Sequence, residues 1–409
     1  MPDKDAMTID ERRKYLKIMR RRYRQGDRHS RGMLLREMEQ VTGLQRKTLI
    51  RLMHGSLERR ARQRQRGRTY GAEVDDVLRV IAESYDYICA ERLQPNLVAM
   101  AQQLADHGEL RLSAGLLEQL AKISVPSVRR VLRRLTQDEP HLPRRGPEPA
   151  NQATRDIPMR RIPWDASQPG HFEVDLVHHC GPDAGGTYVH TLQLIDVATG
   201  WSERVAVLGR SYLAMRDAFQ RVLARVPFAV LELHPDNGSE FFNAHLLQFW
   251  GERVRQAELS RSRPWHKNDN RFVEQKNDSL VRAYLGKQRL DTVAQCRALN
   301  ALYDKMWLYY NLFQPVMRLC GKEYRTLEDG SLRLHRHFDS ARTPFDRLAP
   351  TPIFSLERKD ALATLRRSLN PRHLRREIYA DLDALFALPC ATPGVTENVL
   401  DALAVPVDA

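Results

Sequence analysis

The sequence predicts a multidomain chain with an all-helical N-terminal region, a central α/β part and a mainly helical C-terminal region. The chain has 409 residues, enough for about three domains of ordinary size. Its formal charge of +14 is concentrated in residues 1–150, which hold 31 of the 65 Lys and Arg but 20 of the 51 Asp and Glu. Helical periodicity dominates before residue 136, whereas runs rich in β-branched and aromatic residues follow residue 170.

Composition excludes several classes of protein. No run approaches the ~18 apolar residues of a membrane helix, and the N-terminus lacks the apolar core of a signal peptide. The five cysteines are scattered and form no CxxC pair, so neither a disulfide framework nor a thiolate zinc site is indicated. We therefore expect no membrane partner and a location in a reducing cytoplasm.

Residues 30–55 have the apolar spacing of two short helices separated by a turn at Gly43. The second helix would bury Leu49 and direct Arg46, Lys47 and Arg51 outward, as a helix-turn-helix does with its recognition helix. The run RRARQRQRGR follows it. This run contains Arg59, Arg60, Arg62 and Arg64, which we expect to contact phosphates, although a solvated linker is the alternative.

A second pair of helices is predicted at residues 113–135, with a turn at Ile123 and Pro126 in the first turn of the second helix. Val128 and Val131 form part of its apolar stripe. Arg129, Arg130 and Arg133 fill the other face, which suits DNA binding. Ordinary amphipathic helices of a bundle are the alternative, but two basic pairs in so basic a segment favour double-stranded DNA as the partner.

The centre of the chain has the pattern of a β/α domain. Residues 136–170 are rich in proline and polar residues and are predicted to be a linker. The expected elements after it are strands at 171–179, 187–196 and 201–207, a helix at 211–225, a strand at 228–233, and helices from 239 to 252 and around 274. A mixed loop region to about residue 355 and two helices split by Pro371 complete the chain. The predicted domains are 1–70, 71–138, a linker at 139–168, 169–320 and 321–409.

Three carboxylates occupy positions where this β/α domain could bring them together. Asp175 lies within a strand expected to be central, Asp236 directly follows the fourth strand, and Glu274 is early in a helix. An unpaired carboxylate in a central strand carries a large desolvation cost, which bound divalent cations would remove. Hard ions prefer carboxylate ligands, so the expected cofactor is a pair of Mg²⁺ or Mn²⁺ ions, an arrangement suited to phosphoryl displacement.

The segments HFEVDLV, HPDNGSEF and KNDNRFVEQKN resemble the three blocks of the retroviral-integrase-type DDE transposases of bacterial insertion sequences. The resemblance covers about residues 165–320 and implies an RNase H-like fold. It also implies cleavage and transfer of DNA strands at transposon ends, with Asp175, Asp236 and Glu274 as the metal-binding triad. DNA contacts are then expected at Lys267, Asn268, Asn270 and Lys276 as well. The implied partners are transposon ends and target DNA, bound by a homo-oligomer in the bacterial nucleoid.

Several alternatives stay open at this point. Glu240 and Asp278 are alternative candidates to Glu274 as the third metal ligand. Glu240 lies at a predicted helix start, where the helix dipole explains a carboxylate. His178, His179 and Cys180 carry metal-ligand atoms, but neighbouring strand residues point to opposite faces, which favours a strand end. At the level of function, the alternatives are a catalytically impaired transposase acting as a sequence-specific DNA-binding protein and a general RNase H-like nuclease.

Overall fold

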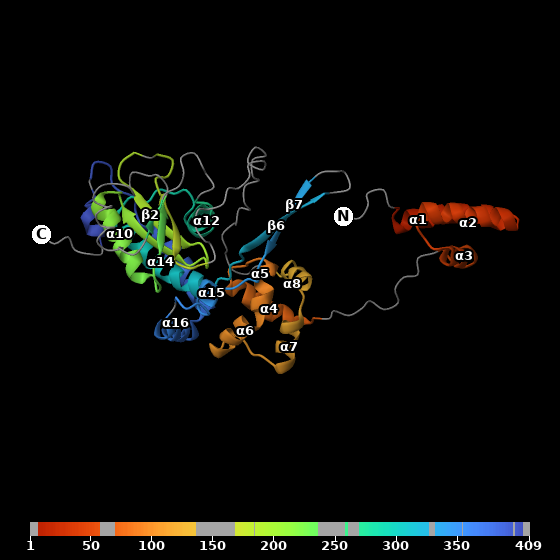
Figure 1. Ribbon diagram of the computed structural model, residues 1–409, viewed down its shortest axis with the longest axis horizontal. Coiled ribbons are helices and arrows are strands. Elements are labelled where there is room, and N and C mark those ends of the chain that lie inside the picture. The colour runs from red at the N-terminus through yellow and green to blue at the C-terminus, as the bar shows by residue number, and fades with distance from the viewer. Residues whose placement is uncertain are drawn as a thin grey trace. The chain divides into compact units, whose positions relative to one another are not determined.

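The chain folds as two compact units, Met1–Thr69 and Tyr70–Ala409 (Figure 1). The computed structural model describes residues 7–57, 70–135, 168–183, 185–235, 258–260, 270–326, 332–353, 355–395 and 397–403. Within these ranges, no helix has the length and apolar character needed to cross a membrane.

The described part of the first unit contains three helices: α1 (Ile9–Gln25), α2 (Arg28–Thr42) and α3 (Arg46–His54). The two helices predicted around Gly43 form, and Gly43 ends α2 in the left-handed conformation (φ 65°) that glycine adopts without strain. Helix α1 was not predicted from the sequence. The unit has its own core, formed by Leu16, Met19, Tyr23, Leu34, Leu35, Met38, Leu49, Met53 and Leu57.

The second unit begins with a group of short helices, shown in orange in Figure 1. They are α4 (Ala72–Ser84), α5 (Ala90–Leu93), η1 (Gln94–Asn96), α6 (Leu97–Asp106), α7 (Ala114–Lys122) and α8 (Val125–Leu132). Helices α7 and α8 form the predicted pair around Ile123, and α8 buries Val128 and Val131.

A five-stranded sheet lies at the centre of the second unit, in the order β3-β2-β1-β4-β5. Its strands are β1 (His171–His178), β2 (Val189–Asp196), β3 (Ser202–Leu208), β4 (Glu232–Pro235) and β5 (Glu258–Leu259). The first three pair antiparallel, whereas β4 is parallel to both β1 and β5. The mixed sheet is compatible with the predicted integrase-like core, and β1 is central as expected.

Strand β4 starts later than the predicted range 228–233. Its partner β1 begins at His171, which pairs with Glu232, so there is no neighbouring strand for the residues before Glu232. The backbone carbonyl of Gly170 accepts the N–H groups of Leu231 and Glu232 at this start point. Phe228 contributes to the core instead, where its ring stacks on Phe172 at 5.7 Å.

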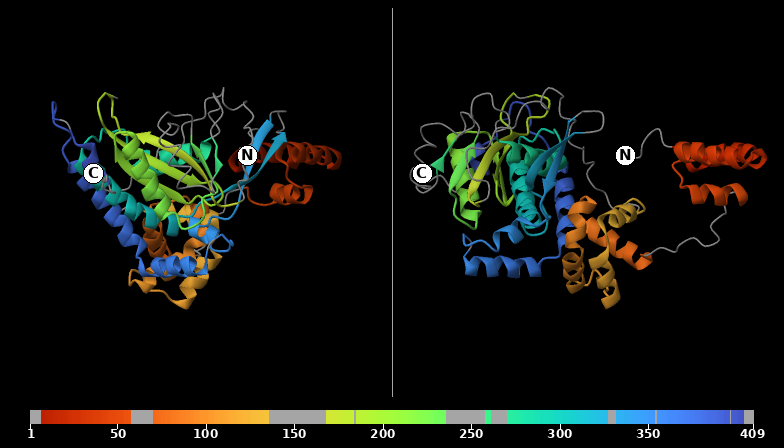
Figure 2. Two further views of the ribbon diagram at one scale, coloured as in Figure 1. Left: turned by 60° about the vertical axis from the view of Figure 1, so that its left-hand side comes forward. Right: turned by 45° about the vertical axis from the view of Figure 1, so that its right-hand side comes forward.

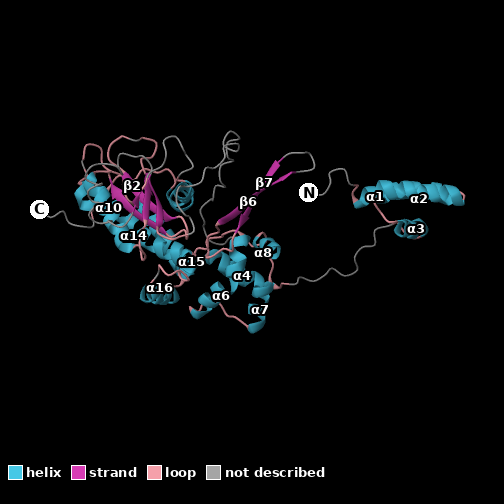
Figure 3. Cartoon of the chain, in the orientation of Figure 1, coloured by secondary structure: helices cyan, strands magenta, loops and turns pink. Residues whose placement is uncertain are grey.

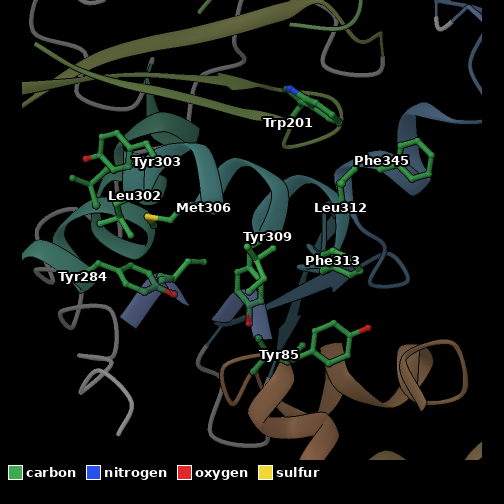
Figure 4. Close-up of a cluster of buried hydrophobic side chains, with 14 of the residues drawn as sticks. Tyr85, Trp201, Tyr284, Leu302, Tyr303, Met306, Tyr309, Leu312, Phe313 and Phe345 are labelled. Atoms are coloured by element: carbon green, nitrogen blue, oxygen red, sulfur yellow. The ribbon is translucent and has the colours of Figure 1, made fainter. Parts of the chain in front are cut away.

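Helices pack around the sheet (Figures 1 and 3). They are α10 (Tyr212–Arg225), α14 (Val293–Leu312) and one composite helix made of α12 (Arg271–Lys276), the π-helical segment η2 (Asn277–Arg282) and α13 (Ala283–Leu285). Figure 4 shows how α14 contributes Tyr303, Met306, Tyr309 and Leu312 to the shared core. The Tyr309 hydroxyl donates to the carbonyl of Ser84 at 2.8 Å, so α4 belongs to the same packed body.

Asp86, two residues after α4, lies in a buried polar network with side chains from two later helices. Its carboxylate accepts hydrogen bonds from Arg375 Nε (2.9 Å) and from the hydroxyls of Tyr379 (2.9 Å) and Tyr284 (3.0 Å). Both Asp86 and Tyr87 have φ of 53°, a left-handed conformation that is costly for residues other than glycine. The network therefore holds the turn after α4 in a conformation that it would not adopt by itself.

The C-terminal part contains a hairpin and four helical segments. Its elements are β6 (Leu319–Thr326), β7 (Leu332–Phe338), α15 (Pro344–Leu348), α16 (Leu356–Ser368), α17 (Pro371–Ala387) and η3 (Val399–Ala402). The two helices predicted around Pro371 form, and Pro371 is the first residue of α17, where its missing N–H costs nothing. The prediction of a loop region up to residue 355 was wrong for β6 and β7. These strands expose both faces, so they lack the apolar alternation by which a strand is recognised.

Candidate active site

Asp175 lies in the middle of the central strand β1, between the buried residues Val174 and Leu176. Its side chain is half-buried. One carboxylate oxygen, Oδ1, accepts the N–H of Leu176 at 2.8 Å, and Oδ2 accepts the side-chain amide of Asn277 at 2.5 Å. Asn277 belongs to the helix that also carries Glu274, so this hydrogen bond attaches that helix to the strand.

Glu173 provides a second attachment and was missed by the sequence analysis. It precedes Asp175 by two positions, which places both carboxylates on the same face of β1. Its Oε2 accepts the backbone N–H groups of Phe272 (2.7 Å) and Val273 (2.8 Å), the free donors at the start of α12. Burial raises the pKa of Glu173 to about 8, although these two hydrogen bonds and the charge of Arg271 lower it. The signal in the sequence was the pair of acids at alternate positions of FEVDLV.

Glu274 lies between the two attachment points along the helix. Its side chain is exposed, whereas Val273 and Asn277 on either side of it are buried. Its negative charge is one of the smaller causes that raise the pKa of Glu173. Val273, Leu280 and Tyr284 form a buried apolar stripe along this helix. The helix becomes π-helical at Asn277. Such segments are rare in proteins, and those that occur often lie at functional sites.

Asp236 lies outside the described residues, as does Glu240. The residue before Asp236 is Pro235, the last residue of β4, and it pairs with Val174 in the parallel register. Val174 in turn precedes Asp175. No cluster of three His, Cys, Asp or Glu side chains suited to a metal occurs in the part of the chain that is described, which does not include Asp236.

The rival ligands have other surroundings. Asp278 is exposed on η2. His179 is buried and bonds through Nε2 to the hydroxyl of Thr191 at 2.7 Å, and burial lowers its pKa to about 3. His178 is the last residue of β1 and packs against the His190 ring at 4.8 Å.

Two of the predicted DNA contacts near Glu274 are described. Lys276 is partly buried, and its pKa is lowered to about 7 by this burial and by the positive charges of Arg92, Arg318 and Arg204. Asn270, which precedes α12, is buried, and neither of its side-chain amide atoms has a hydrogen-bond partner among the described residues. Lys267 and Asn268 lie outside the described ranges.

The predicted basic surfaces of the N-terminal helices are exposed where they are described. On α3, Arg46, Lys47 and Arg51 are solvent-exposed, and Arg46 lies 4.0 Å from the Glu39 carboxylate. Arg59, Arg60, Arg62 and Arg64 lie outside the described residues. On α8 and just after it, Arg129, Arg130 and Arg133 are exposed. Arg129 forms an ion pair with Glu91, and a pair this exposed contributes little stability, so it can exchange for another anion.

Comparison with known proteins identifies one relative that covers most of the chain. The uncharacterized protein y4rM of Sinorhizobium fredii (strain NBRC 101917 / NGR234) is 35% identical over 302 residues, which are 74% of this chain and 86% of y4rM. The chain belongs to the y4rM family. No model of a known protein family matches this y4rM-family chain.

A solved structure similar to the y4rM-family chain is the catalytic core domain of BIV integrase. The sequence identity is 16%, the match covers 35% of this chain and 83% of the integrase core, and the TM-score is 0.26. A TM-score of this size does not establish a common fold. The residues of this y4rM-family member place one carboxylate, Asp175, on the central strand and another, Glu274, on a helix attached to that strand.

Proposed function

We propose that the protein is a DDE transposase, which binds transposon ends and catalyses divalent-metal-dependent cleavage and transfer of DNA strands. Asp175, Asp236 and Glu274 form its catalytic site. The observation that carries this proposal is the double attachment of the helix bearing Glu274 to the acidic face of β1. The attachments are the Asn277 amide on Asp175 and the backbone N–H groups of Phe272 and Val273 on Glu173.

The topology of the sheet supports the proposal. Three antiparallel strands are followed by two parallel ones, with β1 in the middle of the order β3-β2-β1-β4-β5, as expected of an RNase H-like fold. A carboxylate on the central strand and one directly after its parallel neighbour are adjacent in such a sheet. The pairing of Val174 with Pro235 supports this placement for Asp175 and Asp236, since each follows one member of the pair.

The side chains fit a pair of Mg²⁺ or Mn²⁺ ions. Asp175 and Glu274 offer carboxylate oxygens, and the side-chain oxygen of Asn277 is buried with no hydrogen-bond partner among the described residues. Two bound ions would stabilise the attacking and leaving oxygens of a phosphodiester during in-line displacement. The chain's own contribution is positional: the Asn277 amide orients Asp175, and Glu173 fixes the start of the helix that carries Glu274.

The test compares Glu274→Gln and Asp175→Asn with Asp278→Asn, an exposed residue four positions after Glu274. Linear duplexes carrying the DNA that flanks the gene are incubated with each full-length protein and Mg²⁺, and strand transfer is measured on denaturing gels. We expect the first two substitutions to abolish transfer with folding retained, and Asp278→Asn to keep near wild-type activity. Calorimetric titration with Mn²⁺ should show binding to the wild type and its loss in Glu274→Gln.

Other outcomes identify the alternatives. DNA binding without any cleavage in Mg²⁺ or Mn²⁺ would point to an impaired transposase that acts as a DNA-binding regulator. Cleavage of all duplexes without strand transfer would point to a general nuclease. Transfer by Glu274→Gln at a near wild-type rate would refute the assignment of the triad.

A further inference from the structure

The hairpin of β6 and β7, called the ribbon below, is exposed along its whole described length. Every residue of β7 except Leu334 is exposed, and in the described sheets the two strands pair only with each other. Figures 1 and 2 show the ribbon extending away from the body of the second unit. An isolated two-stranded hairpin has marginal stability in water, so its root must be supported by other elements.

The root of the ribbon is attached next to the candidate active site. Asp339, just after β7, accepts the N–H of Arg318 at 2.7 Å and a guanidinium N–H of Arg347 at 2.6 Å. The Arg318 guanidinium donates to the carbonyl of Asp196 at the end of β2 (3.1 Å) and lies 5.2 Å from the centre of the Phe272 ring. Phe272 is the second residue of α12, so the ribbon starts beside the helix that carries Glu274.

Cations gather at this root. Lys322 and Arg336 are direct cross-strand partners. The Arg271 guanidinium lies 4.8 Å from the centre of the Phe272 ring, which Arg318 at the root also contacts. Desolvation and the positive charges of Arg271 and Arg336 lower the pKa of Lys322. Like charges directly opposite each other destabilise a sheet, and a phosphate bound beside Lys322 and Arg336 would offset their repulsion.

The same face of the ribbon continues with Tyr324, Leu332 and Leu334. They alternate with the other face along each strand, and the register sets Tyr324 opposite Leu334. Tyr324 and Leu332 are each 68% exposed. A two-stranded ribbon of this kind has the dimensions to enter the major groove of B-DNA, where apolar groups contact base edges while cations contact phosphates.

We infer that the ribbon is a DNA-contacting arm, which enters the major groove of duplex DNA and binds it through Lys322, Tyr324 and Arg336. The DNA so held leads to the site of Asp175 and Glu274. This inference rests on the proposed function, because it adds a contact surface for the same substrate. The segment between the strands contains Glu328 and Asp329, which lie outside the described residues, so we assign the contact to the strands and the root.

The experiment measures binding of the full-length protein to a 40-base-pair fluorescent duplex by anisotropy, from about 50 to 300 mM NaCl. The variant Lys322→Ala/Arg336→Ala is compared with the control Lys287→Ala/Arg367→Ala, which removes two exposed cations away from the ribbon. We expect the ribbon variant to lower affinity at 100 mM NaCl by roughly tenfold or more, and the slope of log K against log salt to fall by about 1.8. Tyr324→Ser should weaken binding without changing that slope, because tyrosine carries no charge.

Each outcome is decisive. If the wild type binds and the ribbon variant matches the control in affinity and slope, the ribbon inference is wrong while the proposed function stands. If the wild type does not bind duplex DNA even at the lowest salt, both are wrong. If Tyr324→Ser/Leu332→Ser changes the oligomeric state in light scattering but not DNA binding, the ribbon is a contact between copies of the chain, and the inference is refuted.

Discussion

Replacing His190 with phenylalanine should make the second unit less sensitive to mild acid. Burial, together with the nearby charges of His178 and Arg210, lowers the pKa of His190 from 6.5 to about 3. Its Nδ1 has no hydrogen-bond partner among the described residues, and its ring packs against Tyr188 at 4.5 Å. A phenyl ring of similar size can therefore take its place and removes this unsatisfied nitrogen.

The sign follows from proton binding. Below pH 6.5 the unfolded chain takes up a proton at His190 that the folded chain takes up only near pH 3, so stability is lost as the pH falls. Between pH 7.5 and 5.5 this loss is about 1.4 kcal/mol for one histidine. His190→Phe removes it, and other titrating groups cancel because both proteins contain them. The wild type should therefore lose about 1.4 kcal/mol more than the variant over this range.

Urea unfolding followed by tryptophan fluorescence provides the assay, since all five tryptophans belong to the second unit. His335→Phe, on the exposed strand β7, is the matched control and should behave like the wild type. If the wild type and His190→Phe lose the same free energy of unfolding between pH 7.5 and 5.5, His190 is not held neutral by burial and the reasoning is refuted.

Three further predictions concern other parts of the chain. Asn277→Ala should lower the rate of strand transfer and weaken Mn²⁺ binding in calorimetry, because Asp175 loses its orienting amide; unchanged values would remove Asn277 from the site. Asp86→Asn should destabilise the second unit by about 3 to 5 kcal/mol in urea unfolding, since it leaves Arg375 buried without its charge partner. Arg46→Ala/Lys47→Ala/Arg51→Ala should reduce discrimination between the flanking DNA and unrelated duplexes in competition assays, and unaltered discrimination would argue against α3 as a recognition helix.

The central strand could be predicted from sequence because of its composition. Phe172, Val174 and Leu176 alternate along FEVDLV and indicate a strand with one apolar face, and Asp175 stood out as a residue that did not suit a central strand. Glu173 did not stand out, because only the folded structure shows that its carboxylate meets the start of a helix 99 residues later. Long-range partners of this kind leave no local pattern.

Helix α14 shows a different limit of sequence reasoning. It packs against β3 on one side and against α17 on another, so apolar residues are spread around its circumference and give no narrow stripe. The ribbon gave the opposite problem, since it buries almost nothing. Neither element has a distinct apolar periodicity from which it could be predicted.

Helices α1 to α3 and helices α4 to α8 differ in how readily evolution could replace them. Helices α1 to α3 have a core of their own, so a recombination event could replace them with another folded unit and leave the rest of the chain folded. Helices α4 to α8 share their core with the sheet and with α14, and Tyr309 and Arg375 bind the backbone and side chains around Ser84 and Asp86. A change in this second set would have to be accompanied by changes in the partners. Under the proposed function, new DNA specificities should therefore arise by exchange of the first unit and by point substitution in the second.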